Sequence, residues 1–142
     1  MKIKRDLLRL YINFVKNHRK LAPDTYQGMS VKNMEKYLKD TLKSYSLEKL
    51  YFENTLIGFC IYYVAKVPFS SVITMYIGDF AIAPKFQHKG YGKKLMEIME
   101  KIAKKKKCNN ISLVVHANNN KAISFYRGFN FYESRYTLEK EL

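Results

Sequence analysis

The segment with the residue types and spacing best suited to chemistry covers residues 80–93, read F-A-I-A-P-K-F-Q-H-K-G-Y-G-K. An apolar strand runs into Pro84, a loop with Gly90 and Gly92 follows, and a helix begins at once. Such loops leave consecutive backbone N–H groups unpaired around one concavity, and the positive helix end adds to their attraction for anions. Glycine also lets ligand oxygens approach the backbone. The sequence predicts a phosphate-binding loop, with a ligand-free strand-to-helix turn as the alternative.

Two commoner phosphate patterns do not occur in the chain. A dinucleotide fingerprint needs G-x-G-x-x-G with an acidic residue about 20 residues later, and a nucleoside triphosphate loop needs G-x-x-x-x-G-K-[ST]. The segment 87–92 instead resembles Q/R-x-x-G-x-G/A, the pyrophosphate loop of the GNAT superfamily of acetyl-CoA-dependent N-acyltransferases. The similarity continues through the next helix, the strand I-S-L-V-V-H-A and the stretch N-N-N-K-A-I-S-F-Y-R-G-F-N-F.

This resemblance implies the activity and the cofactor. We expect an N-acetyltransferase that moves an acetyl group from its co-substrate acetyl-CoA to a primary amine of a small molecule or peptide, by direct attack in a ternary complex. The resemblance also implies that Phe80, Ala81 and Ile82 give backbone contacts to the pantetheine arm, as if the arm were an added strand. The pyrophosphate would be held by Gln87, His88, Lys89, Gly90, Tyr91, Gly92 and Lys93.

Within that loop the backbone amides are expected to bind phosphate, whereas Lys89 and Lys93 either add charge contacts or stay solvated. Asn119 would orient the pantetheine arm, cap the helix that follows, or do both. Tyr126 matches the family tyrosine that protonates the leaving thiolate. A thiol with a pKa of about 8.5 leaves easily, and a phenol with a pKa of about 10 can supply a proton, so the match is chemically sensible. The alternative is that Tyr126 is a core aromatic of a short amphipathic helix.

The general base has three candidates. An amine resembling that of lysine is ~3.4 pH units below its pKa at pH 7, so holding it neutral costs ~4.6 kcal/mol. Asp79, His116 or a chain of water molecules could relieve that cost, although each side chain could equally be structural. Some relatives carry a glutamate base where this chain has Val114. The two remaining histidines, His18 and His88, are expected on the surface.

The elements that position these residues follow from periodicity. Leu7, Tyr11, Phe14 and Val15 predict a first helix, and Ser30 caps a second with the stripe Met34, Leu38, Leu42 and Tyr45. The segment A-P-D-T-Y-Q-G between them, residues 22–28, is predicted to be a loop. Strands are predicted at 47–53, 56–66, 72–83 and 111–117, with helices at 90–106 and at 119–127, the latter ended by Gly128. A final strand pair is expected at 130–134 and 135–141, and a first strand near residues 1–5 stays open.

This order predicts an α/β (α+β) layered fold and one domain over residues 1–142. In the GNAT fold that it resembles, a mixed central sheet of six to seven strands is flanked by about four helices. Asn130 stands where the family usually has glycine, and asparagine tolerates the left-handed conformation that the turn needs.

Composition bounds the remaining classes. The 142 residues are 47% hydrophobic and 15% aromatic, which favours a folded globule with a real core. No apolar run approaches the ~20 residues of a membrane span and no signal peptide is complete, so a cytoplasmic protein without membrane partners is expected. Cys60, expected to be a buried thiol, and Cys108 have no metal-ligand spacing with the histidines, so we expect no metal site.

Half of the net charge of +14 lies in residues 85–107, which hold nine lysines against two glutamates. A positive field attracts coenzyme A and nucleic acids alike, but no nucleic-acid reading motif is present, so no specific nucleic acid is expected. Two alternatives to the enzyme therefore stay open: a non-catalytic acyl-CoA-binding module of the same fold, and a small nucleic-acid binder. A homodimer through the last strands would also fit.

Overall fold

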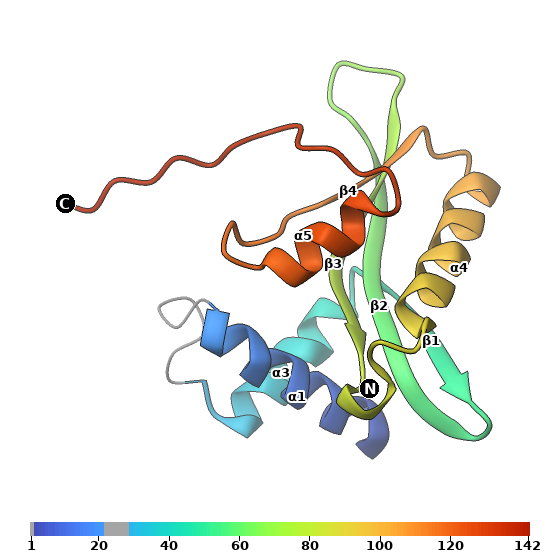
Figure 1. Ribbon diagram of the computed structural model, residues 1–142, viewed down its shortest axis with the longest axis vertical. Coiled ribbons are helices and arrows are strands. Elements are labelled where there is room, and N and C mark those ends of the chain that lie inside the picture. Colours follow the sequence, from blue (N-terminus) through green and yellow to red (C-terminus); the bar gives the residue numbers. More distant parts are fainter. Residues whose placement is uncertain (1, 22–28) are drawn as a thin grey trace.

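The computed structural model describes residues 2–21 and 29–142. Four α-helices and four strands lie there, labelled as in Figure 1. In chain order the elements are α1 (Arg5–Leu21), α3 (Val31–Thr41), β1 (Ser46–Phe52), β2 (Thr55–Lys66), β3 (Ile73–Ile82), the 3-10 helix η1 (Pro84–Phe86), α4 (Tyr91–Lys105), β4 (Asn110–Leu113) and α5 (Asn120–Arg127). The loop predicted between the first two helices, at 22–28, lies outside the described residues.

The strands form one mixed sheet in the order β1-β2-β3-β4. The first three pair antiparallel, and β4 runs parallel to β3. The prediction of a mixed sheet is confirmed, but six to seven strands is wrong, because the sheet of the described residues has four. Since β4 pairs only with residues 74–77 of β3, residues 78–82 have β2 on one side and no strand partner on the other within the described chain.

Helices cover both faces of the sheet, because β2 carries apolar side chains on both (Figure 1). On one face, Phe59 and Ile61 pack with α1 and α3. On the other face, Ile57 and Cys60 pack with α4. Cys60 is fully buried, as predicted. Burial of each large apolar side chain contributes about 1.5–3 kcal/mol, so these two clusters fix where the helices lie on the sheet.

The predicted helices are present, but α3 ends at Thr41, so Leu42 is its C-cap and Tyr45, predicted as part of its stripe, lies beyond it and is exposed. Ser30 accepts a hydrogen bond from the backbone N–H of Asn33 at 3.2 Å, and Met34 and Leu38 of α3 are buried. The apolar stripe of α1 is buried at Leu7 and Tyr11. None of the helices in the described part of the chain has the length and apolar character needed to cross a bilayer.

The C-terminal end differs most from the expectation. The strand predicted at 111–117 ends at Leu113, and the strand pair predicted over 130–141 does not form. Residues 131–142 have no regular structure, and Figure 1 shows this segment running away from the body of the molecule. A two-residue hairpin turn favours Gly, Asn or Asp, and between the two predicted strands the chain offers only Ser134.

Three smaller expectations concern the residues after α5 and those before α1. Asn130 has φ 66°, so the left-handed turn predicted at this asparagine is confirmed. Gly128 is the C-cap of α5, as predicted, but in a right-handed conformation. Residues 2–4 precede α1 without regular structure, so they supply none of the missing strands.

Candidate functional site

The loop between η1 and α4 presents a run of unpaired main-chain amides. The N–H groups of Phe86 and Gln87 close the η1 turn on Ala83 and Pro84, and the N–H of Lys94 is the first to bond within the helix, to Gly90. Among the backbone hydrogen bonds of the described chain, none uses the N–H of residues 88–93. These six donors at a helix N-terminus match what the main chain offers to phosphate in other anion sites.

The backbone of this loop is bent into a concavity. His88 has φ 61° and Gly90, the N-cap of α4, has φ 88°, so left-handed residues alternate with others along the loop. Such alternation turns successive N–H groups toward one point. Any side chain at Gly90 would be strained in this conformation, although a Cβ there would have open space around it.

The neighbouring side chains anchor the loop. A Cβ on Gly92 would lie 3.2 Å from the Phe125 ring of α5, so this glycine makes room for helix packing. Its role in ligand approach stays a prediction. The Tyr91 ring packs edge-on against Phe86, with 5.8 Å between ring centroids. The Lys89 ammonium lies 6.0 Å from the centre of the Phe86 ring. Side chains therefore hold the loop in place while its amides stay available.

Gln87 acts on the protein itself. Its side-chain amide donates to the carbonyl oxygen of Ile82 at 3.0 Å and so ties the loop to the end of β3. Phe80, Ala81 and Ile82, predicted to hold the pantetheine arm, form the end of β3 that has no strand partner on its β4 side in the described chain. The structure thus places the open strand edge directly before the amide loop.

Tyr126 lies on α5, against the strand that carries the predicted donor contacts. Its ring is 6.3 Å from that of Phe80 and 5.6 Å from that of Phe131. Burial, with a smaller contribution from Cys60, raises the pKa of the Tyr126 hydroxyl well above its usual value. The phenol is therefore protonated at physiological pH, so it can donate a proton but cannot act as a base, and the same burial makes it a weaker acid than a solvated tyrosine.

Asn119 fulfils the capping role that was one of its two predicted functions. Its side-chain oxygen accepts from the N–H of Ala122 at 3.2 Å, at the start of α5. The cap fixes the first turn of the helix that carries Tyr126.

Asp79 lies at a bulge in β3. The pairing with β2 skips Gly78, so a bulge places Asp79 opposite Ile61, on the sheet face covered by α1. Burial raises the pKa of its carboxyl to about 6. A carboxylate with a pKa close to physiological pH is suited to accept a proton during catalysis.

The other base candidate and its neighbours fit less well. His116 is exposed, beyond the end of β4. Val114, at the position of the glutamate base in some relatives, has a side chain 95% exposed and no titratable group. None of the three residues is among those that line the hollow between α1 and β3, so burial is what separates Asp79 from the other two.

Sequence reasoning missed the contribution of α1. A hollow of about 160 Å³ lies between α1 and the end of β3. It is lined by Leu10, Asn13, Phe14, Asn17, His18, Phe80, Ala81, Ile82 and Gln87. The lining positions of α1 recur at helical spacing beside its buried stripe, which is the signal that could have identified them.

His18 was expected on the surface but is half-buried in this hollow. Its Nδ1 lies 3.1 Å from the carbonyl oxygen of Phe14, and its ring lies 4.1 Å from the Phe14 ring. Burial lowers the pKa of His18, and the nearby His116 lowers it further. A neutral imidazole therefore faces the strand that is predicted to hold the donor.

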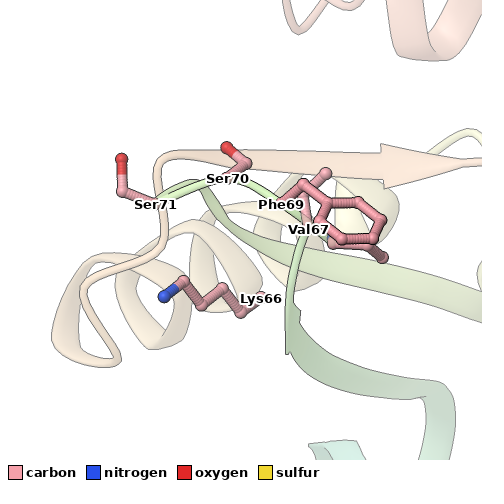
Figure 2. A pocket seen from close by; sticks show the side chains of 6 residues that line it. Lys66, Val67, Phe69, Ser70 and Ser71 are labelled. Carbon is pink, nitrogen blue, oxygen red and sulfur yellow. The ribbon is translucent and has the colours of Figure 1, made fainter.

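A larger hollow of about 490 Å³ has no connection with these residues (Figure 2). It lies at the tip of the β2–β3 hairpin and is lined by consecutive residues, Lys66, Val67, Pro68, Phe69, Ser70 and Ser71. Lys66 is its only titratable side chain, so it offers no acid–base pair. Within the described residues, no three His, Cys, Asp or Glu side chains gather closely enough to hold a metal ion.

Solved structures share this fold. The BH1408 protein from Bacillus halodurans, solved as a tetramutant, has a TM-score of 0.79 at 17% identity, covering 96% of this chain and 92% of that one. The ribosomal-protein-alanine N-acetyltransferase from Brucella melitensis biovar Abortus 2308 has a TM-score of 0.73 at 12% identity, covering 96% and 91%. An aminoglycoside acetyltransferase from an uncultured soil metagenomic sample, meta-AAC0020, has a TM-score of 0.69 at 20% identity, covering 95% and 90%.

The search of curated protein sequences found no match. The model of the acetyltransferase (GNAT) family, by contrast, matches residues 9–131, which include most of α1, the amide loop and α5. The predicted resemblance is thereby confirmed, and the chain belongs to the acetyltransferase (GNAT) family.

Proposed function

We propose that this protein is an acetyl-CoA-dependent N-acetyltransferase that acetylates a primary amine by direct attack in a ternary complex. The observation that carries the proposal is the free main chain around the end of β3: an open strand edge at 78–82, then unpaired amides at 88–93. The open strand edge suits the amide groups of a pantetheine arm, and the unpaired amides suit a pyrophosphate.

The proposed reaction has two proton transfers, one from the attacking amine and one to the leaving sulfur. The amine nitrogen attacks the thioester carbonyl and gives its proton to the Asp79 carboxylate. When the tetrahedral intermediate collapses, the C–S bond breaks and the sulfur receives the hydroxyl proton of Tyr126. Support for these roles comes from the pKa of about 6 at Asp79 and from the buried, neutral phenol of Tyr126 beside Phe80.

The acceptor is proposed to enter from the α1 side, where the hollow beside β3 is lined by Asn13, Asn17 and His18. These side chains offer hydrogen bonds and no carboxylate, so polycations have no special attraction to the hollow itself. The amine classes to compare are aminoglycosides, peptide N-termini, protein lysines and polyamines; the first two include the acceptors named for two of the structural neighbours.

The test is a thiol-release assay with acetyl-CoA and each amine class, beside calorimetry of acetyl-CoA alone. The proposal expects saturable binding of acetyl-CoA and thiol release that depends on one class of amine. Binding without amine-dependent release from any class would favour a non-catalytic acyl-CoA-binding module. No heat of binding at all would contradict both functions.

A further inference from the structure

Three tyrosine side chains, Tyr45, Tyr63 and Tyr76, form a row on the sheet face that carries α1 and α3, and they are called the tyrosine row below. Side chains alternate along β2, so Tyr63 points to the same face as Phe59 and Ile61, which pack with these helices. Tyr76 of β3 lies directly opposite Tyr63, and the two rings stack with 4.9 Å between centroids and 17° between planes. The ring of Tyr45, which follows α3 in the chain, lies 4.9 Å from that of Tyr63.

The tyrosine row ends at Tyr76, on the side of β4. The Tyr63 ring contacts both other rings, whereas in the described part of the chain the Tyr76 ring contacts only that of Tyr63. Next to Tyr76 in the sheet comes Ser112 of β4, a small residue. Tyr45 is 36% exposed, and Tyr63 and Tyr76 are partly exposed, so the row is open in a way that a core cluster is not. A further flat ring can therefore stack on Tyr76, because aromatic pairs favour offset or edge-on contacts with about 4.5–7 Å between centroids.

The tyrosine row lies beside the proposed base. The bulge at Gly78 places Asp79 on the same face as Tyr76, and Gly78 itself is exposed and has no side chain to separate the two. A rise of about 3.3 Å per residue puts Asp79 within about 10 Å of Tyr76 along β3. The residues of β3 that line the hollow beside α1 are 80–82, on the other side of Asp79. An amine that reaches Asp79 therefore has the row on one side and the hollow on the other.

We propose that the tyrosine row selects the acceptor and that the acceptor is an arylalkylamine, a primary amine joined by a short chain to an aromatic ring. The ring stacks on Tyr76 over Ser112, and the chain brings the amine to Asp79. This inference rests on the proposed acetyl transfer and names its substrate class. The C–N bond forms at this amine, whose proton goes to Asp79, while the C–S bond of the thioester breaks and the sulfur receives the proton of Tyr126. The products are an N-acetylated arylalkylamine and free coenzyme A.

Charge favours this class over other amines. The tyrosine row and its small neighbours Gly78 and Ser112 carry no charge, so the surface beside Asp79 offers ring faces and no carboxylate to the body of a substrate. Polyamines and aminoglycosides carry several positive charges, and they would meet a chain with a net charge of +14. An aromatic ring needs no such partner and gains from stacking. A peptide whose first residue is phenylalanine contains the same arylalkylamine, so the test includes both sources.

The test measures thiol release from acetyl-CoA with 2-phenylethylamine, a tripeptide that begins with phenylalanine, n-butylamine and an aminoglycoside. We expect release with an aromatic amine, and the faster of the two aromatic substrates distinguishes a small molecule from a peptide. Tyr76→Ala should lower kcat/KM for that substrate by about tenfold and kcat/KM for n-butylamine by less than about twofold. Tyr76→Phe keeps a ring and should keep both values. Tyr37→Ala removes an exposed ring of α3 and is the matched control, which should change neither value.

A second variant and a binding measurement separate this inference from the proposed function. Tyr76→Leu fills most of the same space without a ring, so it repeats the test if the alanine variant does not fold. An equal loss for both kinds of amine, or release only with amines that have no ring, would overturn the inference and leave acetyl transfer in place. Calorimetry of 2-phenylethylamine is done with protein saturated with coenzyme A. Heat that disappears in Tyr76→Ala, without thiol release from any amine, would sustain the aromatic site and contradict the transfer, whereas no heat and no release would contradict both.

Discussion

Asp79 is a carboxyl group that folding deprives of water without giving it a positive partner, since burial is the only cause of its raised pKa. The pKa is about 6 in the folded chain and 3.8 without burial. The native state therefore favours the protonated carboxyl. The stability that this gives is fully present below about pH 4 and is lost as pH rises through about 6.

Replacing Asp79 by Asn should therefore stabilise the protein in a pH-dependent way. At pH 8 the wild type buries a charged carboxylate and the variant does not, so we expect the free energy of unfolding to rise by about 1–3 kcal/mol. At pH 4 the two proteins should be alike. Urea unfolding at both pH values measures this, with Glu97→Gln on the exposed face of α4 as the control.

The same Asp79→Asn variant should lose activity, because asparagine cannot accept the amine proton. Loss of a general base lowers kcat by about 10²–10⁴-fold. In the wild type, activity should rise with pH through about 6 as the carboxyl ionises. A variant that is more stable at pH 8 and yet fully active would show that Asp79 is merely buried and that the proton leaves by another route.

Tyr126→Phe separates the acid role from the packing role. Phenylalanine keeps the ring contacts with Phe80 and Phe131, so the fold and the affinity for acetyl-CoA should change little. Without the hydroxyl, kcat should fall by about 10²-fold or more. Steady-state kinetics with thiol detection measures kcat. Tyr132→Phe, in the exposed C-terminal segment 131–142, is the matched control. Equal activity of both variants would assign Tyr126 to the core alone.

At the scale of elements, the function proposed here depends on the junction between β3 and α4. The strand supplies an open edge, η1 turns the chain, and the first turn of α4 leaves its amides free. The packing of Tyr91 on Phe86 and the Gln87 bond to Ile82 hold these parts in register. A ligand can use such a site without paying for its ordering, because the loop is already anchored.

Gly90→Ala tests the conformation of this junction. A non-glycine residue at φ 88° costs about 1–2 kcal/mol, so the loop should move toward other conformations and the Kd for acetyl-CoA should rise by about tenfold. Gly78→Ala is the control, because a Cβ there meets its nearest atoms at an ordinary 3.5 Å. Calorimetry of both variants measures the effect. Unchanged affinity in Gly90→Ala would mean that the amides of this loop do not hold the pyrophosphate.

The sequence allowed the local features of this junction and of the helices to be predicted, since caps, apolar stripes and the glycine loop depend on neighbours in the chain. Ser30, Asn119 and Asn130 behave as their residue types indicate. The features that depend on distant segments could not be predicted. The Gln87 side chain turns to Ile82, Gly92 makes room for Phe125, and His18 enters the hollow beside β3 only because α1 packs there.

The predicted number of strands was wrong for the same reason. Alternating side chains at 130–141 correctly indicate a sequence able to form strands, but pairing requires a turn or a neighbour, and alternation says nothing about either. Ser134 is the one residue in 131–142 of a type that favours turns, and no Gly, Pro, Asn or Asp stands beside it.

At the scale of the whole molecule, the charge of +14 is unevenly distributed, since half of it lies in residues 85–107, on α4 and its two ends. The amide loop lies at its N-terminus, while the exposed lysine run 104–107 lies at its C-terminal end. A helix of 15 residues is about 22 Å long, and the screening length at physiological salt is about 8 Å. The lysine run is thus too far from the proposed pyrophosphate site to act on a bound cofactor directly.

Replacing Lys104, Lys105, Lys106 and Lys107 by Gln should therefore separate two kinds of anion binding. At physiological salt we expect KM for acetyl-CoA to stay within about twofold, because the removed charges are more than two screening lengths away. Non-specific binding to duplex DNA should weaken strongly and lose part of its salt dependence, since each phosphate contact contributes about 0.9 to the logarithmic slope. Kinetics and fluorescence anisotropy on the same preparations measure the two effects. A large rise in KM with little change in DNA binding would instead place the cofactor phosphates at the C-terminal end of α4, and the amide loop would lose its assigned ligand.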